Sequence, residues 1–297
     1  MSYASGMSAH YASATISLLV SVALSVPAVA QAAPKRIHII GASVSGGFED
    51  GPLFGAKEAG DSVSMHHMLK RWCDGEVKVT THPPMEMCYT FNDPLKIGKK
   101  QIDGCKKRKA DMVVAVDFPF WFAYGYASSP KSRLERLEVC IDYLDGLGVP
   151  VVIGDLPNMK GAARRMLNPR QIPSEESLVK LNARLQKFAA DNDKITVVPM
   201  SNIVKQLKLD GVVLPLKSGG LRTPPGALLQ GDQLHTTRLG VALLVYRIQD
   251  ALRGRFPKDH VLHQRKWTFD EFVEAADAED ELEDLRIDLR EAAKKKE

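Results

Sequence analysis

The chain has 297 residues, of which 44% are hydrophobic, and a formal net charge of +4 at pH 7. This length and apolar content allow a sizeable core, as in a single α/β domain with extensions. The mild charge, without a repeat or an aromatic and basic RNA-binding pattern, argues against nucleic acid as a partner.

Residues 1–32 have the pattern of a removable export signal. The stretch ATISLLVSVALSVPAVAQAAPKR contains a short apolar core followed by small residues, so cleavage is expected after Ala30 or Ala32. The core is shorter than the about 20 residues of a membrane span, so no stable span is expected. No Lys or Arg precedes it, and Met7 is an alternative start; a disordered apolar leader is the other interpretation. We expect an exported protein, periplasmic or secreted.

From Lys35 onward, apolar runs alternate with amphipathic stretches. Strands are predicted over 36–40, 76–81, 110–118, 149–157 and 194–200. Helices are predicted over 57–72, from about 98, and over 133–147, 175–190 and 237–252, where apolar residues recur at helical spacing. This alternation predicts an α/β fold: a parallel sheet of about five strands with helices on both faces, in a three-layer α/β/α sandwich.

The end of the chain differs from the rest in composition. From Trp267 onward it is charged and contains neither Gly nor Pro. Residues 257–297 are therefore expected to form a charged helical extension that is solvated on the surface or frayed. A helix that binds a partner is the alternative.

The four cysteines do not have the spacing of a zinc site. No Cys-x-x-Cys pair is present. Cys140 is predicted to be buried on a helix face, and a disulfide among Cys73, Cys88 and Cys105 stays open, because an exported chain can be oxidised. No His, Asp or Glu cluster has metal-ligand spacing, so neither a metal nor a cofactor is expected.

The stretch KRIHIIGASVSGGFEDGP leaves the first predicted strand at the edge where parallel sheets bind ligands. Gly41, Gly46 and Gly47 do not form the dinucleotide pattern G-x-G-x-x-G, and no Gly-Lys-Ser/Thr follows for a phosphate loop. Two interpretations remain. The glycines either close a purely structural turn, or the turn presents Ser43 as a nucleophile, which requires a base.

A base and its orienting carboxylate are present near the end of the core. Asp232 and His235 are three residues apart, directly before the last predicted helix, which Thr236 or Thr237 is expected to cap. On a turn, this spacing lets the carboxylate reach the near ring nitrogen and leaves the far nitrogen for Ser43. Ser43, Asp232 and His235 are therefore the predicted catalytic residues.

With these two motifs, the chain resembles the SGNH/GDSL hydrolases, a family of esterases, lipases and carbohydrate deacetylases with a flavodoxin-like fold. Gly41, Ser43 and Gly47 match the first block of the family, although Ala42 replaces its Asp. Asp232 and His235 match the last block of the family, Asp-x-x-His. The resemblance covers residues 35–256, which would form the hydrolase domain.

The resemblance also implies an oxyanion hole, here from the Ser43 backbone N–H, Gly98 and Asp117. Asp117 stands where the family has an Asn. An ionised Asp cannot donate a hydrogen bond. Asp117 is therefore expected either to work protonated or to cap backbone N–H groups of the loop as a carboxylate.

The segment DFPFWFAYGYASSP follows the third predicted strand and is rich in aromatic residues. Phe118, Trp121 and Tyr124 are the candidate substrate-binding residues, since aromatic rings suit a sugar or an acyl chain. A hydrophobic plug between loop and core is the alternative. Asp155 is expected to anchor a loop, with contact to the substrate as the alternative. His82 is expected to be a satisfied structural histidine, with an approach to the site as the alternative.

These features together favour an exported serine hydrolase that cleaves ester bonds of a small-molecule or carbohydrate substrate. The departures from the family pattern leave a second hypothesis. The protein would then be a catalytically impaired relative that keeps the fold and binds a glycan or a protein partner. A fold alone does not separate the two, because function lies in the site.

Overall fold

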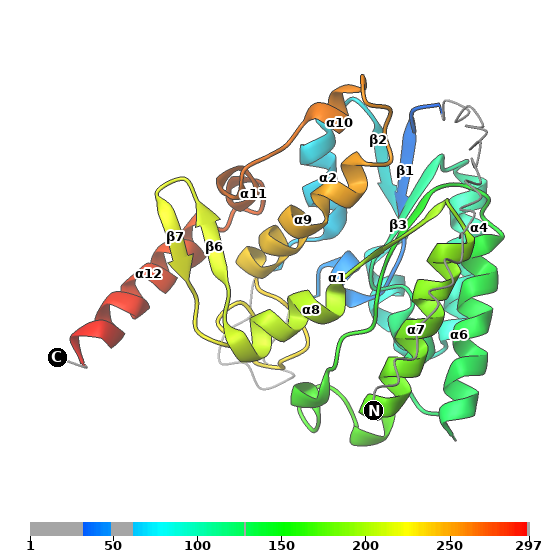
Figure 1. Ribbon diagram of the computed structural model, residues 1–297, viewed down its shortest axis with the longest axis horizontal. Helices are drawn as coiled ribbons and strands as arrows, with labels where there is room; N and C mark the ends of the chain where they lie inside the picture. Colours follow the sequence, from blue (N-terminus) through cyan, green and yellow to red (C-terminus); the bar gives the residue numbers. More distant parts are fainter. Residues whose placement is uncertain (1–31, 49–61, 128, 296–297) are drawn as a thin grey trace, which may run out of the picture. The chain divides into compact units, whose positions relative to one another are not determined.

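The computed structural model describes residues 32–48, 62–127 and 129–295. The predicted export signal lies outside these residues, except for Ala32. Five parallel strands form one sheet in the order β2-β1-β3-β4-β5 (Figure 1). Their bounds are β1 Arg36–Ile39, β2 Lys78–Thr81, β3 Met112–Ala115, β4 Val151–Gly154 and β5 Ile195–Val198. All five predicted strands are present.

The central strands are continuous apolar runs because both of their faces are covered. All four residues of β3 and all four of β4 are buried. Met112 and Val114 point into the core on one face, whereas Val113 and Ala115 point into the core on the other. This alternation is the two-residue period of a strand, and a strand buried on both sides has no polar face.

Helices cover both faces, which confirms the three-layer α/β/α sandwich. On one face lie α2 (Met65–Cys73) and α9 (Arg238–Arg253); on the other lie α4 (Pro94–Lys107), α6 (Pro130–Asp145) and α7 (Glu175–Asp191) (Figure 1). No helix in the described part of the chain is both long and apolar enough to cross a membrane.

Capping side chains set where several helices begin. Ser64 accepts a hydrogen bond from the His67 backbone N–H at 3.2 Å, so α2 begins at Met65, later than predicted. Residues 57–61 of that prediction lie outside the described part. Asp93 caps α4, which therefore begins before Gly98. Thr237 caps α9, as expected.

Several elements were not predicted. The hairpin of β6 (Val213–Leu216) and β7 (Gly219–Arg222) contains a proline and two glycines, which are rare inside strands. The short helical segments give too few residues for a period. They are α1 Ser43–Gly46, α3 Pro84–Cys88, α5 Phe120–Ala123, α8 Met200–Lys205, α10 Val261–Gln264, the 3₁₀ turns Tyr89–Phe91, Lys160–Ala162 and Pro169–Gln171, and the π-helical turn Gln206–Asp210.

The charged end of the chain forms two helices beyond α10, and the first of them is not solvated. In α11 (Phe269–Ala275), Phe269 and Phe272 are fully buried and pack edge-on against Tyr246 of α9. The following α12 (Glu279–Lys294) is mostly exposed, as expected. In the sequence, the apolar residues of α11 are few and stand between acidic residues, so they do not indicate a buried helix.

The question of a disulfide is resolved by the positions of the cysteines. All four lie in the described part of the chain, and all four are free thiols. Cys73, Cys105 and Cys140 are buried on the helices α2, α4 and α6, and Cys88 is half-buried at the end of α3.

Candidate active site

Ser43, His235 and Asp232 meet at the end of β1. Ser43 is the first residue of α1, and its Oγ lies 2.7 Å from Nε2 of His235. The other ring nitrogen of His235, Nδ1, lies 2.5 Å from Oδ2 of Asp232. A continuous chain of hydrogen bonds thus joins a carboxylate, an imidazole and a hydroxyl, in the order that activates a serine for nucleophilic attack.

The loop before α9 holds this carboxylate rigidly. Oδ1 of Asp232 accepts the backbone N–H groups of Leu234 at 2.8 Å and of His235 at 2.9 Å. Burial is the largest influence on the pKa of Asp232 and by itself would raise it. The hydrogen bonds from the His235 ring and from the two backbone groups outweigh burial, so the pKa of Asp232 lies below its ordinary value. Asp232 is therefore a carboxylate at neutral pH.

Two residues outside the predicted motifs support His235 and its loop. Phe48 stacks on the His235 ring, with ring centroids 4.2 Å apart and an angle of 27° between the planes. The side-chain amide of Gln230 donates to the backbone carbonyls of Phe48 at 2.9 Å and of Thr236 at 2.8 Å. Gln230 thereby connects the serine turn to the histidine loop. Neither residue belongs to a motif, so no sequence pattern points to them.

Asp117 holds the turn that presents Ser43. Its Oδ2 accepts the backbone N–H groups of Val44 at 2.9 Å and of Ser45 at 3.1 Å, and the Ser45 hydroxyl donates to Oδ1 at 2.5 Å. Both carboxyl oxygens are thus engaged with α1. The geometry supports the second interpretation of Asp117, the ordering of backbone N–H groups, and not hydrogen-bond donation to an oxyanion. Burial raises the pKa of Asp117, and the bonds from Ser45 oppose this rise in part.

Gly41 allows this close approach. A Cβ atom at Gly41 would lie 2.0 Å from Oδ1 of Asp117 and 2.6 Å from Oγ of Ser45, so no other residue fits. Gln101 of α4 clamps the same peptide from the other side. Its Oε1 accepts from the Gly41 N–H at 2.7 Å, and its Nε2 donates to the Gly41 carbonyl at 2.9 Å. In the sequence, Gln101 stands at helical spacing with Gly98, Ile102 and Cys105, and an amide on this otherwise apolar helix face is the signal that could have found it.

Gly98 is not an oxyanion donor, which corrects the prediction. It is the fifth residue of α4, where the backbone N–H is bonded within the helix. A Cβ atom at Gly98 would lie 2.6 Å from the Phe122 ring, so the glycine serves close packing of α4 on that ring. The Ser43 N–H remains a candidate donor, because the first N–H of a helix has no acceptor within that helix.

The predicted substrate-binding rings belong to the core. Phe118 and Tyr124 are fully buried, and the Tyr124 hydroxyl donates to the Pro157 carbonyl at 2.5 Å and accepts from the Met159 N–H at 3.1 Å. Trp121 is buried between the rings of Phe91 and Phe120. The prediction for these three residues is wrong, and the alternative of a hydrophobic plug describes them.

A small apolar cavity, the acyl cavity, opens beside Ser43. It has a volume of about 50 Å³. Phe120, which was not predicted, lines it together with Pro119, Leu156, Met200, Val204 and Leu234. Gly154 lies in its wall; a Cβ atom there would be 2.4 Å from Cγ of Met200. The cavity has room for a short apolar group next to the Ser43 hydroxyl.

Two further sequence expectations concern polar residues near this edge of the sheet. Asp155 accepts the backbone N–H and the hydroxyl of Ser201, both at 2.6 Å, and so anchors the start of α8, as expected. His82 is buried, and its Nε2 lies 3.1 Å from Oε2 of Glu86. It is therefore a partnered structural histidine, also as expected.

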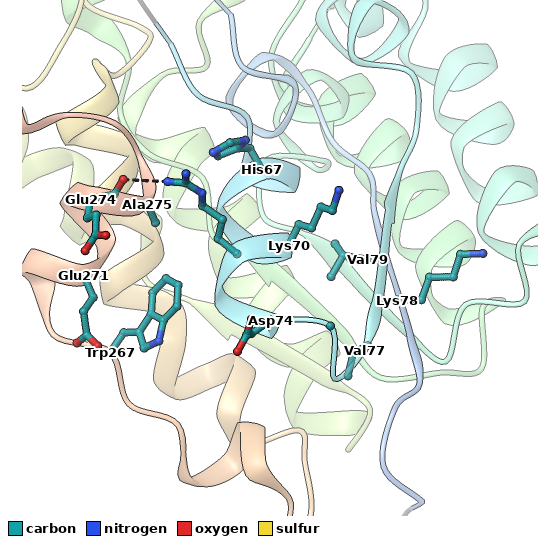
Figure 2. A pocket seen from close by; sticks show the side chains of 12 residues that line it. His67, Lys70, Asp74, Val77, Lys78, Val79, Trp267, Glu271, Glu274 and Ala275 are labelled. Carbon is teal, nitrogen blue, oxygen red and sulfur yellow. Dashed lines mark hydrogen bonds between the residues drawn. The ribbon is translucent and has the colours of Figure 1, made fainter.

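A much larger cavity, of about 860 Å³, lies between α2 and the segment around α11. Figure 2 shows Lys70 and Asp74 on one side and Trp267, Glu271 and Glu274 on the other. Arg71 crosses to the Glu274 carbonyl at 2.9 Å (dashed line in Figure 2). None of Ser43, Asp232 and His235 lines this cavity, so it is not the candidate active site.

No protein-family model and no curated protein matches the chain. Solved structures do match. A lipase/acylhydrolase from Enterococcus faecalis aligns with a TM-score of 0.50 at 20% identity, over 76% of this chain and all of that one. A putative acylhydrolase from Bacteroides fragilis aligns with a TM-score of 0.45 at 14% identity, over 74% of this chain and 87% of that one. At 20% identity, the likeness to the lipase/acylhydrolase shows a shared fold.

Proposed function

We propose that this protein is a serine hydrolase that cleaves ester bonds, with Ser43 as nucleophile, His235 as general acid and base, and Asp232 as the residue that orients His235. The observation that carries the proposal is the unbroken chain of short contacts from Asp232 through His235 to Ser43. All three side chains are buried, which strengthens the electrostatic interactions between them.

The reaction follows from this geometry. The Ser43 oxygen attacks the ester carbonyl while Nε2 of His235 takes its proton, and Asp232 stabilises the imidazolium that forms. When the tetrahedral intermediate collapses, the bond between the carbonyl carbon and the alcohol oxygen breaks, and His235 returns the proton to the departing alcohol. Water, activated by His235, then releases the acid from Ser43. The Ser43 N–H supports the negative oxygen of the intermediate.

The acyl cavity suits a short chain. The cavity has a volume of about 50 Å³, and apolar side chains line it next to the Ser43 hydroxyl. A chain longer than a few carbons would require Phe120, Met200 or Leu234 to move. Acetyl and similar short acyl esters are therefore the proposed substrates.

We also propose that the protein is exported. This part of the proposal is based on residues 1–32 alone, where small residues follow a short apolar core. The second hypothesis, a catalytically impaired binder of a glycan or protein, was based on the departures from the family pattern and on the aromatic segment after β3. In that segment, Phe118, Trp121 and Tyr124 are buried, whereas Tyr126 is 64% exposed. The contact between His235 and Ser43 favours the enzyme over this hypothesis.

A fluorophosphonate probe tests the proposal, because it reacts with an activated serine and not with an inert one. The wild type should be labelled at Ser43, as mass spectrometry of the labelled peptide would show. Ser43→Ala should abolish labelling, whereas Ser45→Ala should retain it. Labelling at Ser45, or none in a folded wild-type protein, would contradict the proposal.

A further inference from the structure

A second, open cavity adjoins the acyl cavity. It has a volume of about 920 Å³ and lies between α7, α8 and the loop after β4; we call it the lysine groove. Asp155 and Leu156 line both cavities. At four places in the chain, one residue lines the acyl cavity and its neighbour in sequence lines the groove. With the acyl-cavity residue first, these pairs are Met159 and Lys160, Met200 and Ser201, Val204 and Lys205, and Leu234 and Gln233. The groove is therefore the space next to the short group that Ser43 holds.

The groove carries an excess of positive charge. Lys160, Lys205 and Lys208 line it, and none of the three forms an ion pair with a described residue. By contrast, Lys180 and Lys187 of α7 are paired with carboxylates on their own helix.

Among the described residues, two carboxylates line the groove, Asp155 and Glu175. Both oxygens of Asp155 already accept hydrogen bonds from Ser201. Glu175 has a single long contact, at 3.5 Å, with the side-chain amide of Asn158. The hydrogen bonds from Ser201 do not neutralise Asp155, so three lysines face two carboxylates. The lining has a net charge of +1, which makes the groove complementary to an anion.

Lys208 connects this charge to the catalytic residues. Its Nζ donates to the backbone carbonyl of Gln233 at 3.1 Å, within the loop that carries Asp232 and His235. Burial lowers the pKa of Lys208, and the negative charge of Asp232 opposes this in part. Apolar surface is present as well, because Val179 and Leu209 on the groove are 70% and 69% exposed.

We propose that the lysine groove binds the alcohol part of the ester substrate and selects a large alcohol that carries a negative charge. The acyl cavity is too small for more than a short acyl group, whereas the groove is large, open and cationic. The substrate class is thus a short-chain acyl ester of a large anionic alcohol with some apolar surface. This inference rests on the proposed esterase function, because it assigns the leaving group of that reaction.

Two acetyl esters of the same ring test the charge selection: 4-acetoxybenzoate, an anion, and 4-acetoxybenzamide, which is neutral. The double variant Lys160→Gln/Lys205→Gln removes two exposed charges and should raise KM for the anion about three- to tenfold, the range expected for two exposed ion pairs. The kcat of both esters and the KM of the neutral ester should not change. Glu175→Gln should lower KM for the anion.

Lys100→Gln is the matched control, since Lys100 is an exposed lysine of α4 outside the groove. It should leave both KM values unchanged. The preference of the wild type for the anion should also weaken at high salt. An unchanged KM for the anion in the double variant, or an equal rise of KM for both esters, would overturn the proposal.

A binding measurement separates failure of the groove from failure of the esterase. If neither ester is hydrolysed, the proposed esterase function is contradicted. Calorimetric titration then tests, without turnover, whether the groove binds an anion. Tetragalacturonate should bind the wild type, bind the double variant three- to tenfold more weakly, and bind better than neutral maltotetraose. Equal binding of the two oligosaccharides, or binding of neither, would overturn the groove assignment.

Discussion

The Ser43 hydroxyl lies 2.7 Å from Nε2 of His235, although 192 positions separate the two residues in the chain. The strand β1 delivers the first residue to the carboxyl edge of the sheet, and the loop before α9 delivers the second. The contact therefore depends on the packing of the whole sandwich and is made by no local element.

Removing either member of this pair should abolish turnover. Ser43→Ala and His235→Ala should each lose nearly all hydrolysis of a short-chain acetyl ester, because in the proposed mechanism Ser43 supplies the nucleophile and His235 transfers the proton. The double variant should be no worse than either single variant, since the residues act as one unit. Asp232→Asn should be milder. Additive losses in steady-state kinetics would show that the two residues act independently.

The local part of this arrangement could be predicted from the sequence. The buried strands read as apolar runs, and Asp232 and His235 are three residues apart, so their contact needs only a turn. Ser43 was recognisable because it follows Gly41 and Ala42 at the end of the first strand. These two patterns in the sequence thus point to the three residues that lie within hydrogen-bonding distance in the structure.

The contacts of the supporting residues Gln101 and Gln230 could not be predicted, for a physical reason. Gln101 is 60 positions from Gly41, and Gln230 is 182 positions from Phe48. Such contacts depend on side-chain packing between elements, which no short pattern records. Gly98 illustrates the converse error, because a glycine that allows close helix packing looks the same in sequence as one that donates an N–H to a ligand.

The acyl cavity should determine chain length. Met200→Ala enlarges the cavity beside Ser43. In a series of 4-nitrophenyl esters, hydrolysis of the butanoyl and hexanoyl esters should therefore rise relative to hydrolysis of the acetyl ester. The truncation of a buried methionine should also lower the free energy of unfolding by about 2–5 kcal/mol.

Met68→Ala is the control for that loss of stability. Met68 is fully buried on α2 and does not line the acyl cavity. It should lower stability by a similar amount and leave the order of preferred esters unchanged. The same change of preference in both variants would show that general loosening of the fold, and not the cavity, sets chain length.

The leader should be removed after Ala30 or Ala32. The small residues at these positions follow the short apolar core at the distance that signal cleavage requires. N-terminal sequencing of the protein recovered from cell fractions should find a mature chain that begins at Gln31 or Ala33. Recovery of an intact Ser2 or Met7 terminus in the cytoplasmic fraction would contradict export.

Asp117 should tolerate an amide better than a deletion. In Asp117→Asn, the amide oxygen can still accept from Val44 and Ser45, whereas Asp117→Ala leaves buried donors without an acceptor, at about 1–3 kcal/mol each. Activity should therefore stay within a few-fold of the wild type in the Asn variant and fall at least tenfold in the folded Ala variant. An Asn variant that is folded but as inactive as Ala would contradict this role.

The stability of the Asn variant should also differ from the wild type in its pH dependence. Burial raises the pKa of Asp117 in the folded state above the value of about 3.9 expected in the unfolded chain. Between these two values the folded state holds the proton more tightly, so folding stability contributed by Asp117 decreases as pH rises through that interval. Asn does not titrate, and Asp232 is common to both proteins. Urea titrations give the free energy of unfolding of each protein. The difference, wild type minus Asp117→Asn, should thus fall as pH rises above about 4 and then level off. Parallel profiles for the two proteins would mean that Asp117 is no harder to ionise in the fold than in the unfolded chain.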